Sequence, residues 1–438
     1  MKGHVLLITY EFPPKGGPGV QRPLKTAKYL SRLGWSVTVL TVKDPMGGMM
    51  DETLLSELPD DVRVERAWSL EPTRVVALLR RLRGVARREH VRTAGSRGYT
   101  SLPRGAIRFI QAFFIPDEKV GWTPWAVSAA RRIHARQHVD VVVASGPPFS
   151  AYGVAWRIAR RLGVPWVADA RDPIVGGYFF KPLTPLHDRL MRRYERKVAR
   201  SAARVVTATD GLTRGITSRV PGAAHAPVTI ANGFDPDDFA GAAAIRREGF
   251  VLTYTGTFQG SIRADVLLEA IAALKTGGSP VIHDLRVRFV GPLDTDTPSA
   301  VTARGLGDIV SLPGYVSHAE AVTEMLGADV LLLVLGPDAA SADIVSAKLP
   351  EYLGAHKPVL ALVPDGLAAD VVRRSGAGEV VRPGDVAGTA AAIERLHAQW
   401  REGALPVPDT DVVAEFDRSE LVARYSRILE QVVEEGAG

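Results

Sequence analysis

The strongest constraint on the fold of this chain is an alternation of short apolar segments with helical segments. The first series contains a predicted strand at Val5–Thr9, a glycine-containing loop at Glu11–Gly19, a periodic helical run from Gln21 to Leu33 and a strand at Val37–Val42. Such alternation is typical of parallel α/β units, in which each helix crosses from one strand to the next. Three further strands are expected in this series, at Asp140–Ala144, Trp166–Ala168 and Ala203–Thr207.

A second α/β series follows an Asn-Gly turn in the segment IANGFD, Ile230–Asp235. It contains a strand at Phe250–Tyr254, a glycine loop and a helix from about Ala264 to Lys275. Later strands are expected at Val287–Val290, Ile309–Ser311, Val330–Val334 and Val359–Leu362. A chain of 438 residues exceeds what one core usually organises. We therefore predict doubly wound Rossmann-like domains at residues 1–235 and 236–415, followed by an amphipathic helix within residues 416–438.

Composition excludes several kinds of chemistry. The chain has no Cys, which excludes disulfides, thiolate-bound zinc, iron–sulfur clusters and cysteine nucleophiles. Its ten His residues form no H-E-x-x-H or comparable ligand spacing, so no metal and no cofactor is expected. Apolar runs such as Val330–Leu335 are far shorter than the roughly 20 residues needed to span a bilayer. With no signal-peptide pattern at the N-terminus, we expect a cytoplasmic location.

Positive charge is concentrated in residues 73–108, which contain ten arginines and one acid, Glu89. Apolar residues recur there at three- and four-residue steps, which predicts an amphipathic helix with arginines on its other side. One interpretation is a solvated helix face. The other is a surface, at residues 74–92, for peripheral contact with an anionic membrane or an anionic acceptor. Nucleic acid is not expected as a partner, because no recognition motif accompanies the charge.

The first glycine loop, EFPPKGGPGVQR, has the character of an anion site. Gly17 and Gly19 precede a helix, and closely spaced glycines let backbone N–H groups approach a phosphate or sugar at a helix N-terminus. A dinucleotide fingerprint is disfavoured, because Arg22 stands where the third glycine belongs. The alternative is a tight surface turn.

The most informative segment is SADIVSAKLPEYLGAHKPVLA. Ser346 is a predicted N-cap, and Pro350 then falls in the first helical turn, where its missing N–H costs little. Lys348 and Glu351 are three residues apart and so share a face at the positive end of the helix. A cation beside free backbone donors suits a diphosphate, and a carboxylate one turn further suits ribose hydroxyls. The alternative is an ordinary intrahelical ion pair on the surface.

This segment resembles the nucleotide-sugar site of the retaining glycosyltransferases of family four, in which a Glu-x7-Glu motif accompanies K-x-x-E-Y-L-x-x-x-K-P-V-L. Other segments agree in order and spacing over nearly the whole chain, among them TYEFPPKGGPGVQR, PDEKVGWTPWA, SGPPFSA, WVADARDP, IANGFD, TYTGTF and LPGYVS. The resemblance implies a GT-B fold, with two Rossmann-like doubly wound domains facing across a cleft and a C-terminal helix crossing back to the first domain. The implied partners are a nucleotide-sugar donor and a saccharide, lipid-linked or small-molecule acceptor.

The resemblance also implies a set of donor-binding residues. The second Glu of the motif corresponds to Glu351 and the basic residue to Lys348, with Leu349 beside it, while the first Glu is replaced by Asp343, which is shorter by one methylene. Many relatives carry Arg and Lys in the donor-phosphate loop where this chain has Thr257 and Ile262, and the next residue, Arg263, is expected to compensate. The remaining donor-binding residues implied are Asn232, Gly256, Tyr315 and Val316.

Candidates on the acceptor side follow two predicted strands of the first domain. Ser145 and Gly146 open the turn SGPP, and Arg171 and Asp172 lie at the end of the next strand. Asp172 is a candidate for positioning an acceptor hydroxyl. The alternative is a structural ion network of Arg171 with its acidic neighbours, Asp169 and Asp172.

The predicted function is metal-independent glycosyl transfer to a hydroxyl, with retention implied by the resemblance. Lys348, Asp343 and Asp172 are the candidate catalytic residues. Two-domain folds of this kind also serve sugar-nucleotide epimerases and sugar phosphorylases, and those remain alternatives. The departures at Asp343, Thr257 and Ile262 leave a non-catalytic nucleotide-sugar-binding partner as a further one.

Overall fold

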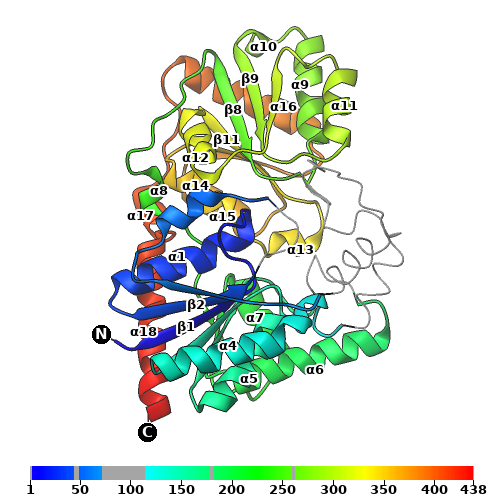
Figure 1. The fold of residues 1–438 in the computed structure, drawn as a ribbon. Helices are drawn as coiled ribbons and strands as arrows, with labels where there is room; N and C mark the ends of the chain where they lie inside the picture. The colour runs from blue at the N-terminus through cyan, green and yellow to red at the C-terminus, as the bar shows by residue number, and fades with distance from the viewer. Residues whose placement is uncertain (1, 44–48, 72–113, 177–181, 259–261, 438) are drawn as a thin grey trace, which may run out of the picture. The chain divides into compact units, whose positions relative to one another are not determined.

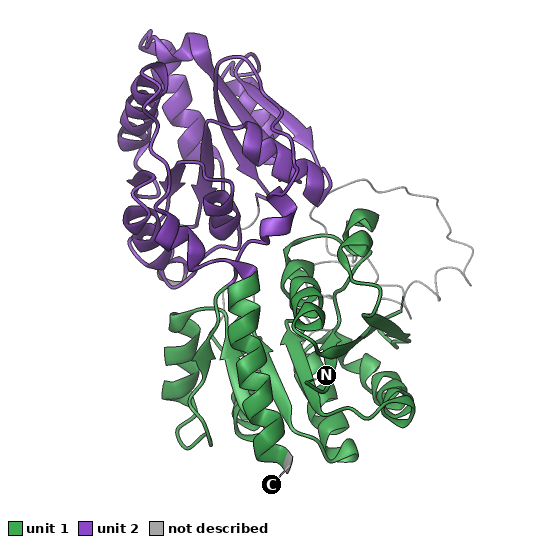
Figure 2. Ribbon diagram, turned by 90° about the vertical axis from the view of Figure 1, so that its left-hand side faces the viewer, with its two compact units in different colours: residues 1–92, 96–231, 419–438 green, residues 93–95, 232–418 purple. Residues whose placement is uncertain are grey.

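The computed structural model describes residues 2–43, 49–71, 114–176, 182–258 and 262–437. Its described residues form two compact units: unit 1 ends at Ala231 and resumes at Ser419, and unit 2 comprises Asn232–Arg418 (Figure 2). The whole of the arginine-rich segment 73–108, including the helix predicted there, lies outside the described residues. No helix in the described part of the chain combines the length and apolarity needed to cross a bilayer.

Unit 1 is built on a parallel sheet, which among the described residues has seven strands in the order β3-β2-β1-β4-β5-β6-β7 (Figure 1). Every residue of β1 and β4 is buried, as expected for central parallel strands that are covered on both faces. The strands are β1 (His4–Thr9), β2 (Ser36–Val42), β3 (Arg63–Ala67), β4 (Val141–Gly146), β5 (Trp166–Ala170), β6 (Arg204–Thr207) and β7 (Val228–Thr229).

Helices cover both faces of this sheet. Successive strand residues point to opposite faces, so the apolar side chains of one strand contribute to a core on each face. Leu6 and Ile8 pack in a core with α4, α5, α6 and α7, while Val5 and Leu7 pack in a second core with α1 and α18. The helical elements are α1 (Pro18–Arg32), η1 (Glu52–Glu57), η2 (Glu118–Trp122), α4 (Thr123–Arg136), α5 (Ser150–Leu162), α6 (Pro185–Ser201), α7 (Asp210–Arg219) and α18 (Arg418–Ala437).

The C-terminal helix α18 thus returns to the N-terminal unit, as predicted (Figure 1). Leu421, Tyr425 and Leu429 are buried in the core that α18 shares with α1. A buried hydrogen bond of 2.8 Å from the Trp35 indole N–H to the Ser426 hydroxyl also fastens the helix to this unit.

Unit 2 repeats the architecture. Its six-stranded parallel sheet, counted among the described residues, has the order β10-β9-β8-β11-β12-β13, which is the strand order of unit 1 without its last strand. The strands are β8 (Phe250–Thr255), β9 (Leu285–Val290), β10 (Val310–Gly314), β11 (Val330–Val334), β12 (Val359–Leu362) and β13 (Gly378–Val381). The helices are α8 (Pro236–Phe239), α9 (Asp265–Thr276), α10 (Val281–Asp284), α11 (Asp296–Ala303), α12 (His318–Gly327), α13 (Ala339–Ala342), α14 (Lys348–Gly354), α15 (Leu367–Arg374), α16 (Val386–Arg401) and α17 (Thr410–Ala414).

The structure confirms the predicted fold of two doubly wound Rossmann-like domains, and the strands that the sequence did not reveal lie at sheet edges. β3, β7 and β13 were not predicted, and all three are edge strands. β3 has the sequence RVERA, with three charged residues in five, and β7 has only two residues. An edge strand is buried on fewer sides, so its sequence carries a weaker apolar pattern than that of a central strand.

Candidate functional site

The candidate donor site is at the carboxyl edge of the unit 2 sheet. Its strand order reverses between β8 and β11, and ligands of open α/β sheets bind beyond the carboxyl ends of the strands at such a point. The glycine loop that contains Gly256 follows β8, and α14, which begins at Lys348, lies in the connection after β11. The topology therefore brings both predicted donor-phosphate elements to the strands that flank the reversal.

At this edge of the sheet, three successive loops contain a glycine and so present backbone without a side chain: Gly256, Gly291 and Gly314. Gly256 has φ of +120° and donates its N–H to the Val290 carbonyl at 2.7 Å, and Gly291 has φ of +128° and donates to the Gly314 carbonyl at 2.7 Å. A Cβ added to Gly291 would overlap the carbonyl of Gly256. The loops after β8, β9 and β10 are thus hydrogen-bonded edge to edge, with a spacing that only glycine permits.

Lys348 begins α14, one residue after the predicted start of this helix. Ala347 is the N-cap, so the assignment of Ser346 to that position was wrong by one residue. Ser346 still serves the helix end, because its hydroxyl accepts a long hydrogen bond of 3.4 Å from the Lys348 N–H. Pro350 lies in the first turn, where a missing N–H leaves no intrahelical bond unmade.

The Lys348 side chain extends over the glycine loop and contacts Tyr254. Its Nζ donates to the Tyr254 hydroxyl at 2.6 Å and lies 4.2 Å from the centre of that ring. A Cβ on Gly256 would overlap the end of the lysine side chain. Burial lowers the pKa of Lys348 from 10.5 to about 8, and the opposing effect of the Glu351 carboxylate is smaller.

Tyr254 was not predicted from the sequence as a site residue. It is a buried residue of β8 whose ring stacks on Phe258 at 4.2 Å, and its hydroxyl donates to the Thr257 carbonyl at 3.0 Å. A tyrosine two residues before Gly256 was the available signal, but an aromatic residue in a buried strand is usually read as core.

Helix α14 is fastened to β8 through Tyr352. The buried Tyr352 hydroxyl accepts hydrogen bonds from the Thr255 N–H at 3.1 Å and from the Thr255 hydroxyl at 3.2 Å. Leu349 is fully buried in the same helix, whereas Glu351 is half-buried. Leu349 therefore anchors the helix by packing, which leaves Lys348 and Glu351 as its ligand-directed candidates.

The structure shows the surroundings of the residues that depart from the family pattern in the predicted donor-phosphate loop. Ile262 packs against the core of unit 2, a position in which a lysine would bury a charge. The Thr257 carbonyl is engaged by Tyr254. Arg263 donates to Asp265 at 2.7 Å and to Asp296 at 3.2 Å on the exposed surface. Such exposed pairs are worth about 1 kcal/mol or less, so they hold Arg263 only weakly.

The other predicted donor residues lie on separate connections of unit 2. Tyr315 is 41% exposed and Val316 half-buried in the loop after β10, just before the Ser317–Glu320 capping box of α12. Asp343 is exposed at the C-terminal end of α13.

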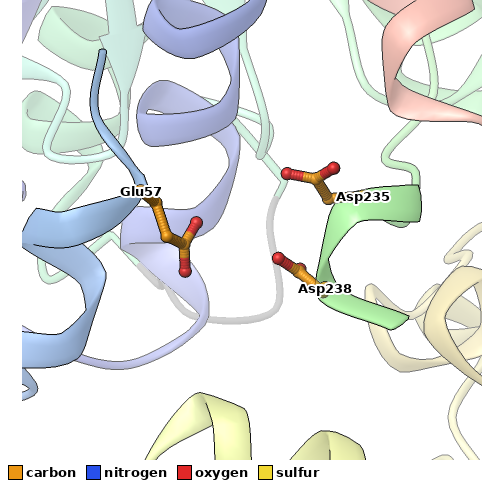
Figure 3. A group of neighbouring side chains, drawn as sticks. All are labelled: Glu57, Asp235 and Asp238. Carbon is orange, nitrogen blue, oxygen red and sulfur yellow. The ribbon is translucent and has the colours of Figure 1, made fainter. Parts of the chain in front are cut away.

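Asn232 opens unit 2, in a segment that packs on α14. The Phe234 ring lies where a Cβ on Gly354 would stand, and the Arg418 guanidinium donates to the Gly233 carbonyl. Asp235 then caps α8, and Figure 3 shows Asp235 and Asp238 on this short helix. Asp238 accepts from His318 at 3.0 Å. Glu57, drawn in the same figure, belongs to unit 1, where it pairs with Lys25.

In unit 1, helix α1 and the ends of strands β4 and β5 are joined around a buried ion pair that was not predicted from the sequence. Arg22 of α1 donates to both carboxylate oxygens of Asp169, with a shortest distance of 2.7 Å, and both side chains are about 5% exposed. The Ser145 hydroxyl donates to the same carboxylate at 2.8 Å. Ser145 is thus placed beside Asp169, buried and hydrogen-bonded to it.

Arg171 donates to backbone rather than to its acidic neighbours. Its guanidinium donates to the carbonyls of Gly19, Gly146 and Pro147. The alternative considered above, an ion network of Arg171 with Asp169 and Asp172, therefore named the wrong partners for Arg171.

Gly17, with φ of +100°, is the N-cap of α1, and both predicted glycines of this loop lie at the start of that helix. Burial raises the pKa of the half-buried Asp172, whereas Arg171 acts to lower it.

Two family models match the chain. Residues 16–233 match the glycosyl transferase 4-like domain, and residues 249–399 match the glycosyl transferases group 1. Together the two matches span most of both α/β series. Among curated proteins, none matches the sequence.

Solved structures share the fold over nearly the whole chain at low identity. Anabaena Alr3699/HepE, solved with UDP, has 16% identity and a TM-score of 0.62, covering 98% of this chain and 99% of its own. Sucrose-phosphate synthase from Thermosynechococcus elongatus has 17% identity, a TM-score of 0.63 and 98% coverage of both chains. WaaG, a glycosyltransferase involved in lipopolysaccharide biosynthesis, has 15% identity and a TM-score of 0.54, covering 99% of this chain and 98% of its own.

Proposed function

This chain belongs to the glycosyltransferases of the family-four type, and we propose that it transfers a hexosyl group from a nucleotide-sugar donor to an acceptor hydroxyl. The observation that carries the proposal is the position of Lys348, at the start of α14 and over the glycine loop that follows β8. One cation, free helix N–H groups and a glycine backbone are the elements that recognise a diphosphate.

We propose that Lys348 contacts the donor diphosphate and that Glu351, one helical turn further, accepts hydrogen bonds from ribose hydroxyls. Gly256 and Thr257 would contribute the loop against which the phosphates lie. Arg263 would supply a second cation, since its exposed pairs with Asp265 and Asp296 are weak enough to exchange for a phosphate. Asn232, Tyr315 and Val316 would complete the donor site of unit 2. Gly17 and Gly19, at the start of α1, would offer backbone N–H donors to a phosphate or sugar of the donor.

We propose that transfer proceeds with retention and without a metal ion. As the bond to the donor sugar breaks, negative charge develops on the leaving diphosphate, and Lys348 with the loop amides would stabilise it electrostatically. The departing phosphate would take the proton of the attacking acceptor hydroxyl on the same face of the sugar. Asp343 would bind hydroxyls of the donor sugar.

On the acceptor side we propose that Asp172 positions the acceptor hydroxyl. Arg171, Ser145 and Gly146 would shape the surrounding loops, because Arg171 already links them through backbone carbonyls. The acceptor class would be a saccharide, a lipid-linked saccharide or a small molecule in polysaccharide or glycoconjugate biosynthesis.

Calorimetry against UDP-, GDP-, dTDP- and ADP-sugars without metal tests the donor site. UDP is the first probe, since HepE was solved with UDP-glucose. Selective binding that is lost in Lys348→Ala and weakened in Glu351→Ala supports the proposal. Lys275→Ala is the matched control, because Lys275 makes only surface contacts with Gly305 and Asp308. Absence of binding to every nucleotide sugar, or equal loss in the control, would contradict it. Product analysis with a panel of acceptors then separates transfer from epimerisation and from phosphate-dependent cleavage.

We also propose a cytoplasmic location with peripheral attachment to an anionic membrane through residues 74–92. Its support is the concentration of arginine in the sequence of that segment. Replacing Arg80, Arg81, Arg87 and Arg88 by Gln should weaken binding to anionic vesicles while donor binding stays intact. Unchanged vesicle affinity would refute the attachment.

A further inference from the structure

A cavity of about 140 Å³ lies in unit 1 among the start of α4, helix α5 and helix α6. Its wall is mainly apolar, and its polar lining includes the side chains of Ser150, Arg157, Tyr194 and Lys197. A water molecule occupies about 30 Å³ of liquid, so the cavity has room for a group the size of a phosphate. None of these four residues belongs to the donor or acceptor candidates described above.

Two cations, Arg157 and Lys197, line this cavity and form no ion pair with a carboxylate among the described residues. Lys197 Nζ lies 3.3 Å from the centre of the Trp156 ring, and the guanidinium carbons of Arg160 and Arg157 lie at 4.9 and 5.7 Å. Arg157 is half-buried and is held by a hydrogen bond of 2.9 Å to the Gly153 carbonyl. Burial, together with Arg157, Arg160 and Arg193, lowers the pKa of Lys197.

The carboxylates nearest in sequence and space are already engaged. On α6, Asp188 pairs with Arg192 at 2.7 Å and Glu195 pairs with Arg219 at 2.8 Å. Asp117, which raises the pKa of Tyr194, accepts from the backbone N–H groups of Ser150 and Lys119 at 2.9 and 3.0 Å. Arg157 and Lys197 therefore form no ion pair in the described part of the chain, and Asp117 is the carboxyl group beside the Ser150 end of the cavity.

A buried hydroxyl in the cavity wall has no well-formed hydrogen bond among the described residues. Ser150 is 2% exposed, and its hydroxyl lies beside the Asp117 carboxyl, whose pKa it helps to lower, without the geometry of a full hydrogen bond. A buried hydroxyl without a partner costs roughly 1–3 kcal/mol, so such groups usually face a ligand or an ordered water. Two cations and a buried hydroxyl without a well-formed hydrogen bond suit an oxyanion.

We infer that this cavity binds a phosphate group, with Arg157 and Lys197 as its cations and Ser150 as a hydrogen-bond donor. The phosphate can come from a soluble phosphate compound or from a phospholipid head group. The lipid source has support in α6, where Leu186 and Leu190 are 65% and 38% exposed and lie at helical spacing before Arg193 and Lys197. An apolar stripe beside cations is the pattern of a helix that contacts a lipid surface.

Two probes distinguish these sources. Inorganic phosphate is titrated calorimetrically, and flotation measures binding to phosphatidylcholine vesicles with and without phosphatidylglycerol. All titrations use a Lys348→Ala background, which removes the cation proposed for the donor site. The test variant is Arg157→Gln with Lys197→Gln. Its control is Arg131→Gln with Arg132→Gln, which makes the same charge change on the exposed face of α4.

The test variant should lose about tenfold or more in affinity for at least one probe, since charge-assisted hydrogen bonds are the strong ones. The probe that is affected identifies the source. Lys197→Arg, which keeps the charge, should retain binding, and circular dichroism with thermal melting confirms that each variant folds. Equal affinities in test and control variants for both probes, or no binding of either probe by the background protein, would overturn the inference.

Discussion

Binding of the nucleotide-sugar donor should weaken as pH rises through about 8, because Lys348 loses its charge there. Burial lowers the pKa of this lysine from 10.5 to about 8 in the ligand-free protein. The charged form is the one that neutralises a diphosphate, so each unit of pH above the pKa removes about 1.4 kcal/mol, or a factor of about ten in affinity. The expected loss is about tenfold at about pH 9 and about a hundredfold at about pH 10.

The assay is calorimetric titration of the donor found in the nucleotide panel, at several values from about pH 7 to about pH 10. Binding that restores the charge also takes up a proton above about pH 8, so the measured enthalpy should depend on the ionisation enthalpy of the buffer. Lys348→Arg is the matched control, since arginine stays charged throughout this range and should give a flat profile. A wild-type affinity that is constant to about pH 10 would refute the reasoning, as would the same decline in Lys348→Arg.

Three further perturbations test other parts of the structure. Tyr254→Phe removes the hydroxyl that accepts from Lys348, so donor affinity should fall severalfold and the midpoint of its pH profile should shift; an unchanged profile would rule out a positioning role for this tyrosine. Gly256→Ala places a Cβ against Lys348 at a φ of +120°, and donor binding measured by calorimetry should fall by about tenfold or more, while near-normal binding would show that the loop tolerates a side chain. Asp169→Asn leaves the buried Arg22 without its counter-ion and should lower the free energy of unfolding by about 3–5 kcal/mol in denaturant titrations. Asp188→Asn, which breaks the exposed ion pair of Asp188 with Arg192, is the control and should lower the free energy of unfolding by less than about 1 kcal/mol. Equal losses of stability in the two variants would contradict the importance of the buried pair.

In the proposed donor site, Lys348 would be the main cation facing the diphosphate, because Thr257 and Ile262 stand where the resemblance implies Arg and Lys. Ile262 is part of the packing against the unit 2 core, and Arg263 is engaged by two surface carboxylates. Lys348 is held instead by the buried Tyr254, through a hydrogen bond of 2.6 Å. A lysine fixed by an aromatic hydroxyl is pre-organised over the glycine loop, which reduces the entropy lost when a ligand arrives.

Much of the candidate donor site could be predicted because its signals are local. Lys348, Pro350 and Glu351 stand within one helical turn, and the spacing alone places the lysine and the glutamate at the start of a helix. The position of the cap was wrong by one residue: side-chain preference favours Ser346, but the helix begins one residue later, and the Ser346 hydroxyl accepts from the Lys348 N–H.

Other parts of the site could not be predicted because they depend on residues far apart in the chain. Tyr254 and Lys348 are separated by 94 positions, and Arg22 and Asp169 by 147. Nothing in the local pattern around Arg22 distinguishes it from a solvated arginine at the start of a helix. Its partner is decided by the packing of α1 against the carboxyl ends of β4 and β5, which also determines that Arg171 donates to carbonyls.

The sequence by itself determined the class of fold, because apolar periodicity records which face of each strand and helix is buried. The central strands β11 and β12 were located to the residue from that pattern, whereas the edge strands β3, β7 and β13 were not, since they are buried on fewer sides. Only the tertiary structure decided which charges are paired and which are left over. Arg22 is neutralised by Asp169, while Arg157 and Lys197 meet around Trp156 without a carboxylate in the described part of the chain. Charge pairing is set by distances between side chains that sequence order does not encode, and those distances exist only once the helices have packed on their sheet.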